Sequence, residues 1–270
     1  MIHGVEDVTN LRRKFDVTCH YAYAVSMSIK KNAPRSRKRA NLVPATRLPL
    51  TRERVLEAGI ALADERGLGP LSMRLLADAL GVKAMSLYNH VAHKDDLIDG
   101  MVDIIAGRIT LPVAGGDWKS AMRQRAVSAR EVFLKHPWTP LLVVSRINIG
   151  PAMLRLIDAT LGCLHAAGFS YEAADQAWNA LDSHLYGFTL QELNFPLEPG
   201  RYASAARDFL PMLPAVQYPH MRALTESVIS GRHSGLHDFQ FGLNLLLDGL
   251  DATQSTPSDP GPSAGREPRG

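Results

Sequence analysis

The sequence predicts an all-α fold in which a small three-helix head precedes a larger helical body. Apolar residues recur with a helical period from about residue 51 to 250, and no alternating strand pattern persists. Glycine and proline close most of the periodic segments, as expected at helix ends. Two cysteines exclude a disulfide-built scaffold, and no stretch approaches about 18 consecutive apolar residues, which excludes a transmembrane helix.

Charge is unevenly distributed along the chain. Between Asp16 and Glu53 there is no acidic residue, and eight basic residues stand there: Lys30, Lys31, Arg35, Arg37, Lys38, Arg39, Arg47 and Arg52. Since the whole chain has a net charge of +3, the remainder carries −5. A basic arm on a mildly acidic body is typical of nucleic-acid binders, and a solubilising tail is the alternative.

The two ends are expected to lie outside the folded core. Residues 1–50 are interpreted as a flexible basic arm, because residues 30–50 are basic, show no hydrophobic period and carry several prolines. The first 26 residues resemble an export signal only weakly, and translation from Met27 is an alternative. Residues 252–270 are rich in Pro, Gly and Ser and are predicted to form a disordered tail.

Residues 51–97 predict the three-helix head. Thr51 is a good N-cap for a first helix that ends at Arg66-Gly67. The buried stripe of this helix is expected to be Val55, Leu56, Gly59, Ile60, Leu62 and Ala63. Ser72 caps a second helix, which Gly81 ends. Its inward residues are expected to be Leu75, Leu76, Ala79 and Leu80.

After Gly81 there is room for a helix of about two turns, Lys83 to Asn89, with Leu87 and Val91 facing the core. Two short helices joined by a glycine turn form a helix-turn-helix, whose second helix is the size that enters a major groove. The outward residues suit contact with DNA, because Ser86 and Tyr88 can donate hydrogen bonds and Met85 can contact a thymine methyl.

The run from Gly81 to Val91, GVKAMSLYNHV, followed by Lys94 and Leu97, resembles the DNA-binding signature of the TetR family of regulators. The resemblance covers the window from Thr51 to about Met101. It implies DNA contacts for Arg74, Lys83, Ala84, Met85, Ser86, Tyr88, His90 and Lys94. Tyr88 and Lys94 would hold phosphates, whereas Arg74 and residues 84–86 would face bases. Lys83 departs from the small capping residue of many members.

Two other interpretations of the same residues stay open. His90, His93, Asp95 and Asp96 faintly resemble the clusters of metallo-hydrolases, although such ligands usually converge from the ends of strands. Tyr88 and His90 could also merely cap and pack. The sequence predicts no metal and no cofactor.

Residues 98–251 predict a helical regulatory and dimerisation domain, which begins with a helix from about Asp95 to Ile109 and a break over residues 111–117. The further expected helices are 118–135, 151–167, 171–195, 201–210, 219–230 and 236–250. The last is apolar over a wide surface, with Phe239, Leu243, Leu246, Leu247 and Leu250, and favours a partner helix. The resemblance implies a homodimer through helices 171–195 and 236–250.

A small-molecule cavity is predicted inside the body. Trp178, Asp182, Leu185 and Thr189 share one helix face, and Trp138, Met153 and Ile157 could face them. Simple filling of the core is the alternative for each of these residues. The related tetracycline repressor takes its drug with magnesium, but no such ligand set can be mapped here. His233 and His237 have a spacing that could hold a metal, but Gly235 between them favours a loop or frayed turn. Cys163 is expected in the core.

The sequence therefore indicates a cytoplasmic, ligand-responsive transcriptional regulator without membrane contact. It is expected to be a repressor that binds a palindromic operator in double-stranded DNA as a homodimer, and that a small-molecule effector releases. The alternative is a small helical enzyme that kept a DNA-reading module and uses Asp182 and His184 for acid–base chemistry on an apolar substrate.

Overall fold

A computed structural model describes residues 49–197, 199–235 and 237–255. The expected arm, the export-like segment and the alternative start at Met27 lie outside these residues, apart from Pro49 and Leu50. The expected disordered tail lies mostly outside them as well. Its boundary is nevertheless corrected, because the last helix continues to Ser255. An ion pair of 2.7 Å between Lys119 and Asp251 holds the end of this helix.

The regular secondary structure of the described residues consists of helices, with no strand among them, which confirms the predicted all-α class. They divide into two compact units, one formed by residues 49–193 with 237–255 and the other by residues 194–235. The single regulatory domain expected over 98–251 therefore includes a separate compact unit. None of the helices in the described part of the chain is long and apolar enough to cross a membrane.

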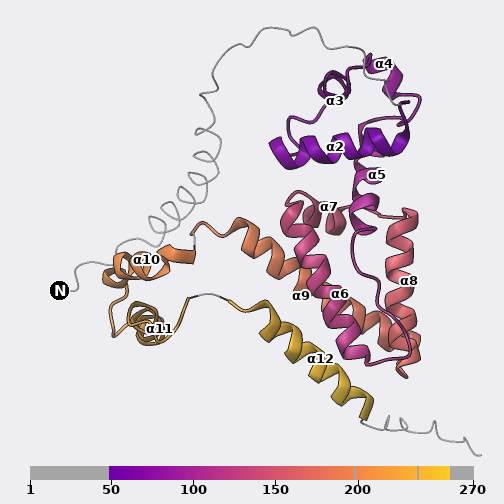
Figure 1. Cartoon of the computed structure of the whole chain (residues 1–270). Helices are drawn as coiled ribbons and strands as arrows, with labels where there is room; N and C mark the ends of the chain where they lie inside the picture. The colour runs from indigo at the N-terminus through magenta and orange to yellow at the C-terminus, as the bar shows by residue number, and fades with distance from the viewer. Residues whose placement is uncertain (1–48, 198, 236, 256–270) are drawn as a thin grey trace, which may run out of the picture. The chain divides into compact units, whose positions relative to one another are not determined.

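The head consists of α2 (Arg52–Arg66), α3 (Met73–Leu80) and α4 (Ala84–Leu87), shown in Figure 1. Thr51 and Ser72 cap α2 and α3 as predicted, because their side chains accept hydrogen bonds from the third following backbone N–H. Gly81 adopts φ +67°, in the left-handed region that glycine enters without strain. The whole predicted stripe of α2 is buried.

Two details of the head differ from the prediction. Ala79 on α3 is exposed, whereas Ala77 is buried with Leu76, because α3 presents a narrower face to the core than the four expected residues would cover. The helix after the glycine turn is also shorter than predicted. It ends at Leu87, and residues 88–90 continue as turns, bonded from His90 N to Leu87 O.

Helix α5 (Lys94–Ala106) passes from the head into the body. It packs against α2 at two glycines: a Cβ on Gly59 would lie 2.8 Å from Met101 Sδ, and one on Gly100 would lie 2.8 Å from Leu56. A side chain at either position would displace the end of the Met101 or Leu56 side chain, so glycine permits this close packing. The predicted domain boundary at residue 97 therefore falls inside one continuous helix whose residues complete the core of the head.

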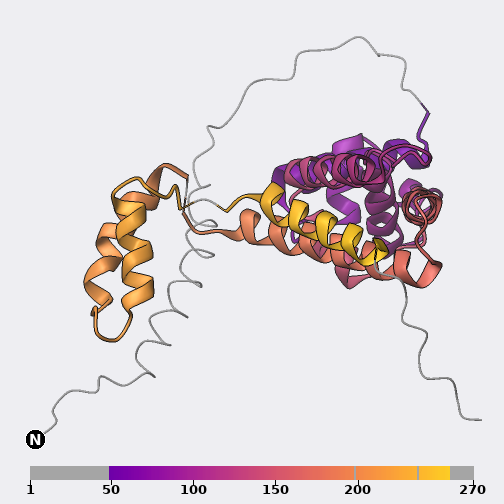
Figure 2. The ribbon, with the colours of Figure 1, turned by 90° about the horizontal axis from the view of Figure 1, so that it is seen from below.

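The body consists of α6 (Trp118–Lys135), α7 (Thr139–Ser145), α8 (Pro151–Ala166), α9 (Tyr171–Asn194) and α12 (Phe239–Ser255). The expected helices are confirmed within a few residues at their ends, and α7 was not predicted. Helix α12 runs alongside α9 (Figure 2), where the rings of His184 and Phe239 stack with centroids 5.1 Å apart. Cys163 is buried in the core as expected.

The second unit contains α10 (Tyr202–Phe209) and α11 (Pro219–Ile229), which pack side by side (Figure 2). Short 3₁₀ turns, η1 (Pro199–Arg201) and η2 (Leu210–Met212), flank α10. His233 lies in a turn, where its Nδ1 accepts a hydrogen bond from Gly235 N at 2.8 Å. This agrees with the expected loop.

Candidate functional site

The segment of residues 83–90, here called the recognition segment, projects from the head on a buried base. Leu87 and Val91 are fully buried, as predicted, and anchor the segment to the core. Met85 and Tyr88 lie on the opposite side, with 75% and 45% of their surface exposed. The segment therefore presents one large apolar side chain and one hydroxyl to the exterior.

The other residues predicted to contact DNA surround these two. Arg74, Lys83 and Lys94 are exposed, and Ala84, Ser86 and His90 are half-buried. Lys83 occupies the N-cap of α4 without a side-chain hydrogen bond to the helix. Within the described part of the chain, Arg74, Lys83 and Lys94 form no ion pair with an acidic residue, so their charges face outward.

Hydrogen bonds with Arg52 and Asp96 hold the turn at the carboxyl end of the recognition segment. The Arg52 guanidinium donates to His90 O at 2.7 Å and to the Asp96 carboxylate at 2.6 and 3.1 Å. Asp96 also accepts from Ala92 N at 2.7 Å. The Arg52 contact holds the pKa of Asp96 below its usual value. Arg52, counted with the basic arm above, thus has a structural role that sequence reasoning missed.

The same contacts account for the residues of the metal-site alternative. His93 caps α5, because its Nδ1 accepts from Asp96 N at 3.1 Å. Asp95 pairs with Arg146, and Asp96 pairs with Arg52. No group of three or more His, Cys, Asp or Glu residues that could hold a metal ion is found among the residues described here.

A polar joint connects α2 to the turn between α6 and α7. Asp64 accepts from His136 Nδ1 at 2.9 Å and from Trp138 Nε1 at 2.7 Å. Arg108 donates to His136 Nε2 at 2.9 Å and forms a two-point ion pair with Glu57. Because a guanidinium only donates, His136 Nε2 must accept, which assigns the proton to Nδ1. Trp138 was wrongly expected at a cavity, since Asp64 holds it at this joint.

Two further contacts tie α5 to the body. Asp103 on α5 accepts from the backbone N–H groups of Ala152 and Met153, each at 2.9 Å, and so caps α8 from a neighbouring helix. Arg146, directly after α7, reaches Asp99 at 2.7 Å and Asp95 at 3.2 Å on the first turns of α5. Both contacts join α5 to segments that surround the cavity described next.

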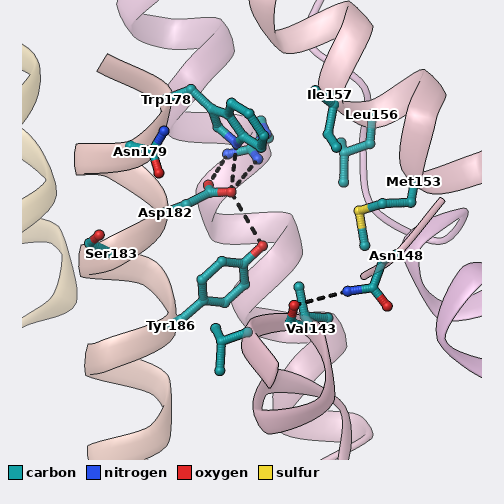
Figure 3. Close-up of a pocket in the computed structure, with 12 residues that line it drawn as sticks. Val143, Asn148, Met153, Leu156, Ile157, Trp178, Asn179, Asp182, Ser183 and Tyr186 are labelled. Atoms are coloured by element: carbon teal, nitrogen blue, oxygen red, sulfur yellow. Dashed lines mark hydrogen bonds and ion pairs between the residues drawn. The ribbon is translucent and has the colours of Figure 1, made fainter. Parts of the chain in front are cut away.

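A cavity of about 350 Å³ lies between α6, α7, α8 and α9 (Figure 3). Four of the predicted residues line it: Met153, Ile157, Trp178 and Asp182. The other lining residues are Arg125, Val143, Val144, Asn148, Leu156, Asn179, Ser183 and Tyr186. The volume falls in the range of sites for drug-sized molecules, about 300–1,000 Å³, and the walls are mainly apolar and aromatic.

Asp182 is the centre of a buried polar cluster in the cavity wall. Its carboxylate accepts from Arg125 at 2.7 and 3.1 Å, from Trp178 Nε1 at 2.7 Å, and from the Tyr186 hydroxyl at 3.2 Å. Burial opposes the charge of Arg125, but the attraction of Asp182 outweighs it and the pKa of Arg125 is raised. Burial, with Asp182 nearby, raises the pKa of Tyr186. Arg125 and Tyr186 were not predicted.

Three residues expected near this cluster lie elsewhere. Leu185 and Thr189 are buried in the core and do not line the cavity, and the Thr189 hydroxyl donates to Leu185 O. His184 donates from Nε2 to Phe239 O at 3.0 Å, on the side of α9 that faces α12. Asp182 and His184 therefore do not form the acid–base pair of the enzyme alternative.

Together, an exposed recognition segment on a three-helix head and a cavity in a helical body define a DNA-binding regulator with a ligand-binding domain. Comparisons with known proteins agree. Residues 55–101 match the family model of bacterial regulatory proteins of the tetR family, and residues 111–254 match that of the tetracyclin repressor-like C-terminal domain. This chain belongs to the TetR family.

Individual relatives extend this result. The chain is 31% identical over 212 residues to the HTH-type transcriptional repressor DrrR1 of Streptomyces coeruleorubidus, covering 75% of this chain and 77% of DrrR1. It is 39% identical over 207 residues to the class D tetracycline repressor of Escherichia coli, covering 73% and 93%. ActR of Streptomyces coelicolor, solved with actinorhodin, superposes with a TM-score of 0.66 at 27% identity over 77% of this chain and all of ActR. The protein is a ligand-responsive DNA-binding regulator.

Proposed function

We propose that the protein is a homodimeric repressor that binds a palindromic operator through two recognition segments and leaves it when a small molecule occupies the cavity. It acts in the cytoplasm, where the DNA is, and it does not turn over its ligand. The observation that carries the proposal is the pair of contacts on α5: Arg52–Asp96 beside the recognition segment, and Asp103 with the backbone N–H of Met153, whose residue lines the cavity.

Pairing through α9 and α12 is supported by the exposed surface of these helices. Phe241 and Leu245, one turn apart on α12, are 67% and 60% exposed. Gly187 on α9 and Gly249 on α12 have open space where a Cβ would stand, so a second helix can approach closely. A two-fold dimer places its recognition segments roughly 34–36 Å apart, which is one turn of B-DNA.

Release would follow from a movement of α5. Helix α8 and the segment after α7 both carry residues that line the cavity, and they contact α5 through Asp103 and Arg146. Helix α5 in turn packs closely against α2 at Gly59 and Gly100. A ligand that displaces α8 or the end of α7 would therefore carry the head with α5. The ligand shifts the equilibrium only by its difference in affinity for the two states, and a change from 1:99 to 99:1 needs about 5.5 kcal/mol.

Selection of DNA fragments by the purified protein, followed by sequencing, tests the operator. We expect an inverted repeat whose half-sites lie about 10 base pairs apart, centre to centre. A single unrepeated site, or no enrichment, would contradict the dimeric repressor.

The enzyme alternative predicts chemical change in a bound molecule, whereas a regulator returns its ligand intact. Mass spectrometry of a ligand recovered after long incubation with the protein distinguishes the two. Recovery of the unaltered compound is the expected result.

A further inference from the structure

The polar joint contains a continuous chain of hydrogen bonds that links α2 to the ends of α5 and α6. The Arg108 guanidinium binds the Glu57 carboxylate on one side and His136 Nε2 on the other. His136 Nδ1 in turn binds the Asp64 carboxylate. Glu57 and Asp64 are seven residues apart on α2, about two turns, so both carboxylates lie on one face of this helix. Arg108 follows α5, and His136 is the C-cap of α6.

The contact between Arg108 and His136 requires a neutral imidazole. Arg108 Nη1 donates to His136 Nε2 at 2.9 Å, and a guanidinium has no acceptor. An added proton would sit on Nε2 and point at the guanidinium N–H, so two donors and two positive charges would meet at this distance. Asp64, in contrast, attracts a charged ring more strongly than a neutral one. Protonation therefore breaks the Arg108 side of the chain and strengthens the Asp64 side.

The surroundings of the ring pass this repulsion on to the helices. The charged groups that contact the ring are Asp64, from α2, and Arg108, from the end of α5. The uncharged ring of Trp138 lies beside it at the start of α7, and Lys135 of α6 is exposed. Glu57 holds the guanidinium at two points, and the histidine is only 9% exposed. The repulsion therefore acts between the segments that carry the two cations, which are the end of α5 and the turn after α6.

We propose that His136 is a proton-sensitive positioning residue for DNA binding. The neutral ring holds the end of α5 where the head binds the operator, and protonation displaces α5 and weakens the complex. Histidine is the side chain that ordinarily changes charge between about pH 5 and 8. The inference rests on the proposed function, because it takes movement of α5 as the route by which the head leaves DNA. It goes beyond that function by adding a second signal, the proton, that acts outside the cavity.

The substitution His136→Gln isolates the effect of the proton. A glutamine amide can accept from Arg108 and donate to Asp64, as the neutral ring does, but it does not take up a proton in this pH range. Binding of the full-length protein to a labelled duplex, chosen from the fragments that it selects at about pH 8, is measured from about pH 5.5 to 8 at constant ionic strength. We expect equal affinities at the upper limit. At the lower limit the unmodified protein should bind about tenfold more weakly than the variant, the size of one hydrogen bond to a charged group.

Two further variants locate the effect at this contact. The amide of Arg108→Gln can turn either its oxygen or its NH₂ group toward the ring, so this variant should lose the additional pH dependence as well. His220→Gln, at an exposed histidine on α11, is the control and should keep the pH profile of the unmodified protein. Circular dichroism shows which variants fold. A folded His136→Gln or Arg108→Gln variant with the pH profile of the unmodified protein would overturn the proposal.

A measurement on the unmodified protein does not depend on any variant. Coupling between two binding events is reciprocal, so if protonation weakens DNA binding, DNA must lower the affinity of His136 for a proton. Nuclear magnetic resonance of protein labelled at the histidine ring nitrogens reports the charge of this ring. At about pH 6 the protonated fraction should fall when the selected duplex is added. A fraction that rises or stays constant would overturn the proposal.

Failure of the proposed function would give a different result. A protein that selects no DNA at any pH would refute the proposed repressor and this inference with it. A protein that selects an inverted repeat, but binds it with the same pH dependence before and after His136→Gln, would refute only the role of His136.

Discussion

Tyr88 and the basic residues around it show how one segment divides its side chains between the core and the exterior. Leu87 and Val91 fix the segment to the core, whereas Tyr88 is 45% exposed. The nearby arginines behave differently. Arg52 is held by Asp96 and Arg146 by Asp95 and Asp99, so they organise the head, whereas Arg74 is available for DNA.

Substitution of Tyr88→Ala should weaken operator binding about tenfold while the dimer stays intact. The expected loss corresponds to one hydrogen bond of about 0.5–1.5 kcal/mol in each of two subunits. A gel-shift titration measures it. Tyr218→Ala is the matched control, because Tyr218 is equally exposed (46%) but lies in the second unit. Equal affinities for both variants would remove Tyr88 from the interface.

Substitution of Lys94→Ala should reduce the dependence of binding on salt. If Lys94 neutralises one phosphate in each subunit of the dimer, its loss lowers the slope of log affinity against log salt by about two, uniformly over all DNA sequences. Lys135→Ala, an exposed lysine at the end of α6, serves as the control and should leave the slope unchanged. A loss confined to one operator sequence would mean that Lys94 reads a base.

Helix α5 is the element on which the regulatory contacts converge. Its first turns receive Arg52 and Arg146, its middle packs on α2, and Asp103 near its end caps α8. A capping side chain normally belongs to the helix it caps. Because Asp103 acts across two helices, any movement of α8 must either carry α5 along or break these hydrogen bonds.

Removal of the shared cap should uncouple the ligand from DNA. Asp103→Ala and Asp117→Ala each delete one N-cap, at α8 and α6, and each should lower the free energy of unfolding by about 1 kcal/mol. Only Asp103→Ala should reduce the difference in operator affinity measured with and without effector. Denaturant titration and gel shifts check the two parts. Equal coupling in both variants would exclude α5 as the route.

Local patterns predicted most elements of this fold, and long-range contacts account for what they missed. Caps such as Thr51, Ser72 and Gly81 form hydrogen bonds with residues only a few positions away, so the local sequence is enough to predict where these helices begin and end. Helix α7 escaped prediction because its seven residues are too few to show a helical period. Its Pro140 lies in the first turn, where proline is tolerated.

The missed site residues share a different cause. Asp64 and Trp138 are 74 positions apart in the sequence, and Arg125 and Asp182 are 57 apart. Contacts between residues so far apart leave no local pattern from which they could be predicted. Trp178 and Asp182 were predicted correctly at the cavity, since they lie on the same helix face one turn apart. Leu185 was assigned to that face as well, but it belongs to the core.

At the scale of the whole molecule, two copies are required for the proposed function, because a single recognition segment reads only half of a palindrome. The exposed Phe241 and Leu245 on α12 favour a partner helix. Phe239 and Leu243, on the opposite face of α12, are buried. One face of α12 therefore packs against the core of its own chain, and the other is open to a second copy.

The double substitution Phe241→Glu/Leu245→Glu should shift the protein to monomers and weaken operator binding by more than tenfold. Two carboxylates on this face oppose burial against a second copy. Analytical ultracentrifugation measures the mass. Leu224→Glu, at a residue of similar exposure (57%) on α11, is the control and should leave the mass unchanged. A double variant that stays dimeric would assign pairing to another surface.

The continuity of α5 also decides where this protein can be joined to another. Met101 and Ile105 are fully buried and belong to the same apolar cluster as the residues of α2. A chimera that borrows the DNA-reading part alone must therefore take the chain through at least Ala106. A splice at residue 97 would remove Met101 and Ile105 from the core of the transplanted head. If such a chimera failed to bind DNA, the cause would be the incomplete core, and the result would say nothing about operator choice.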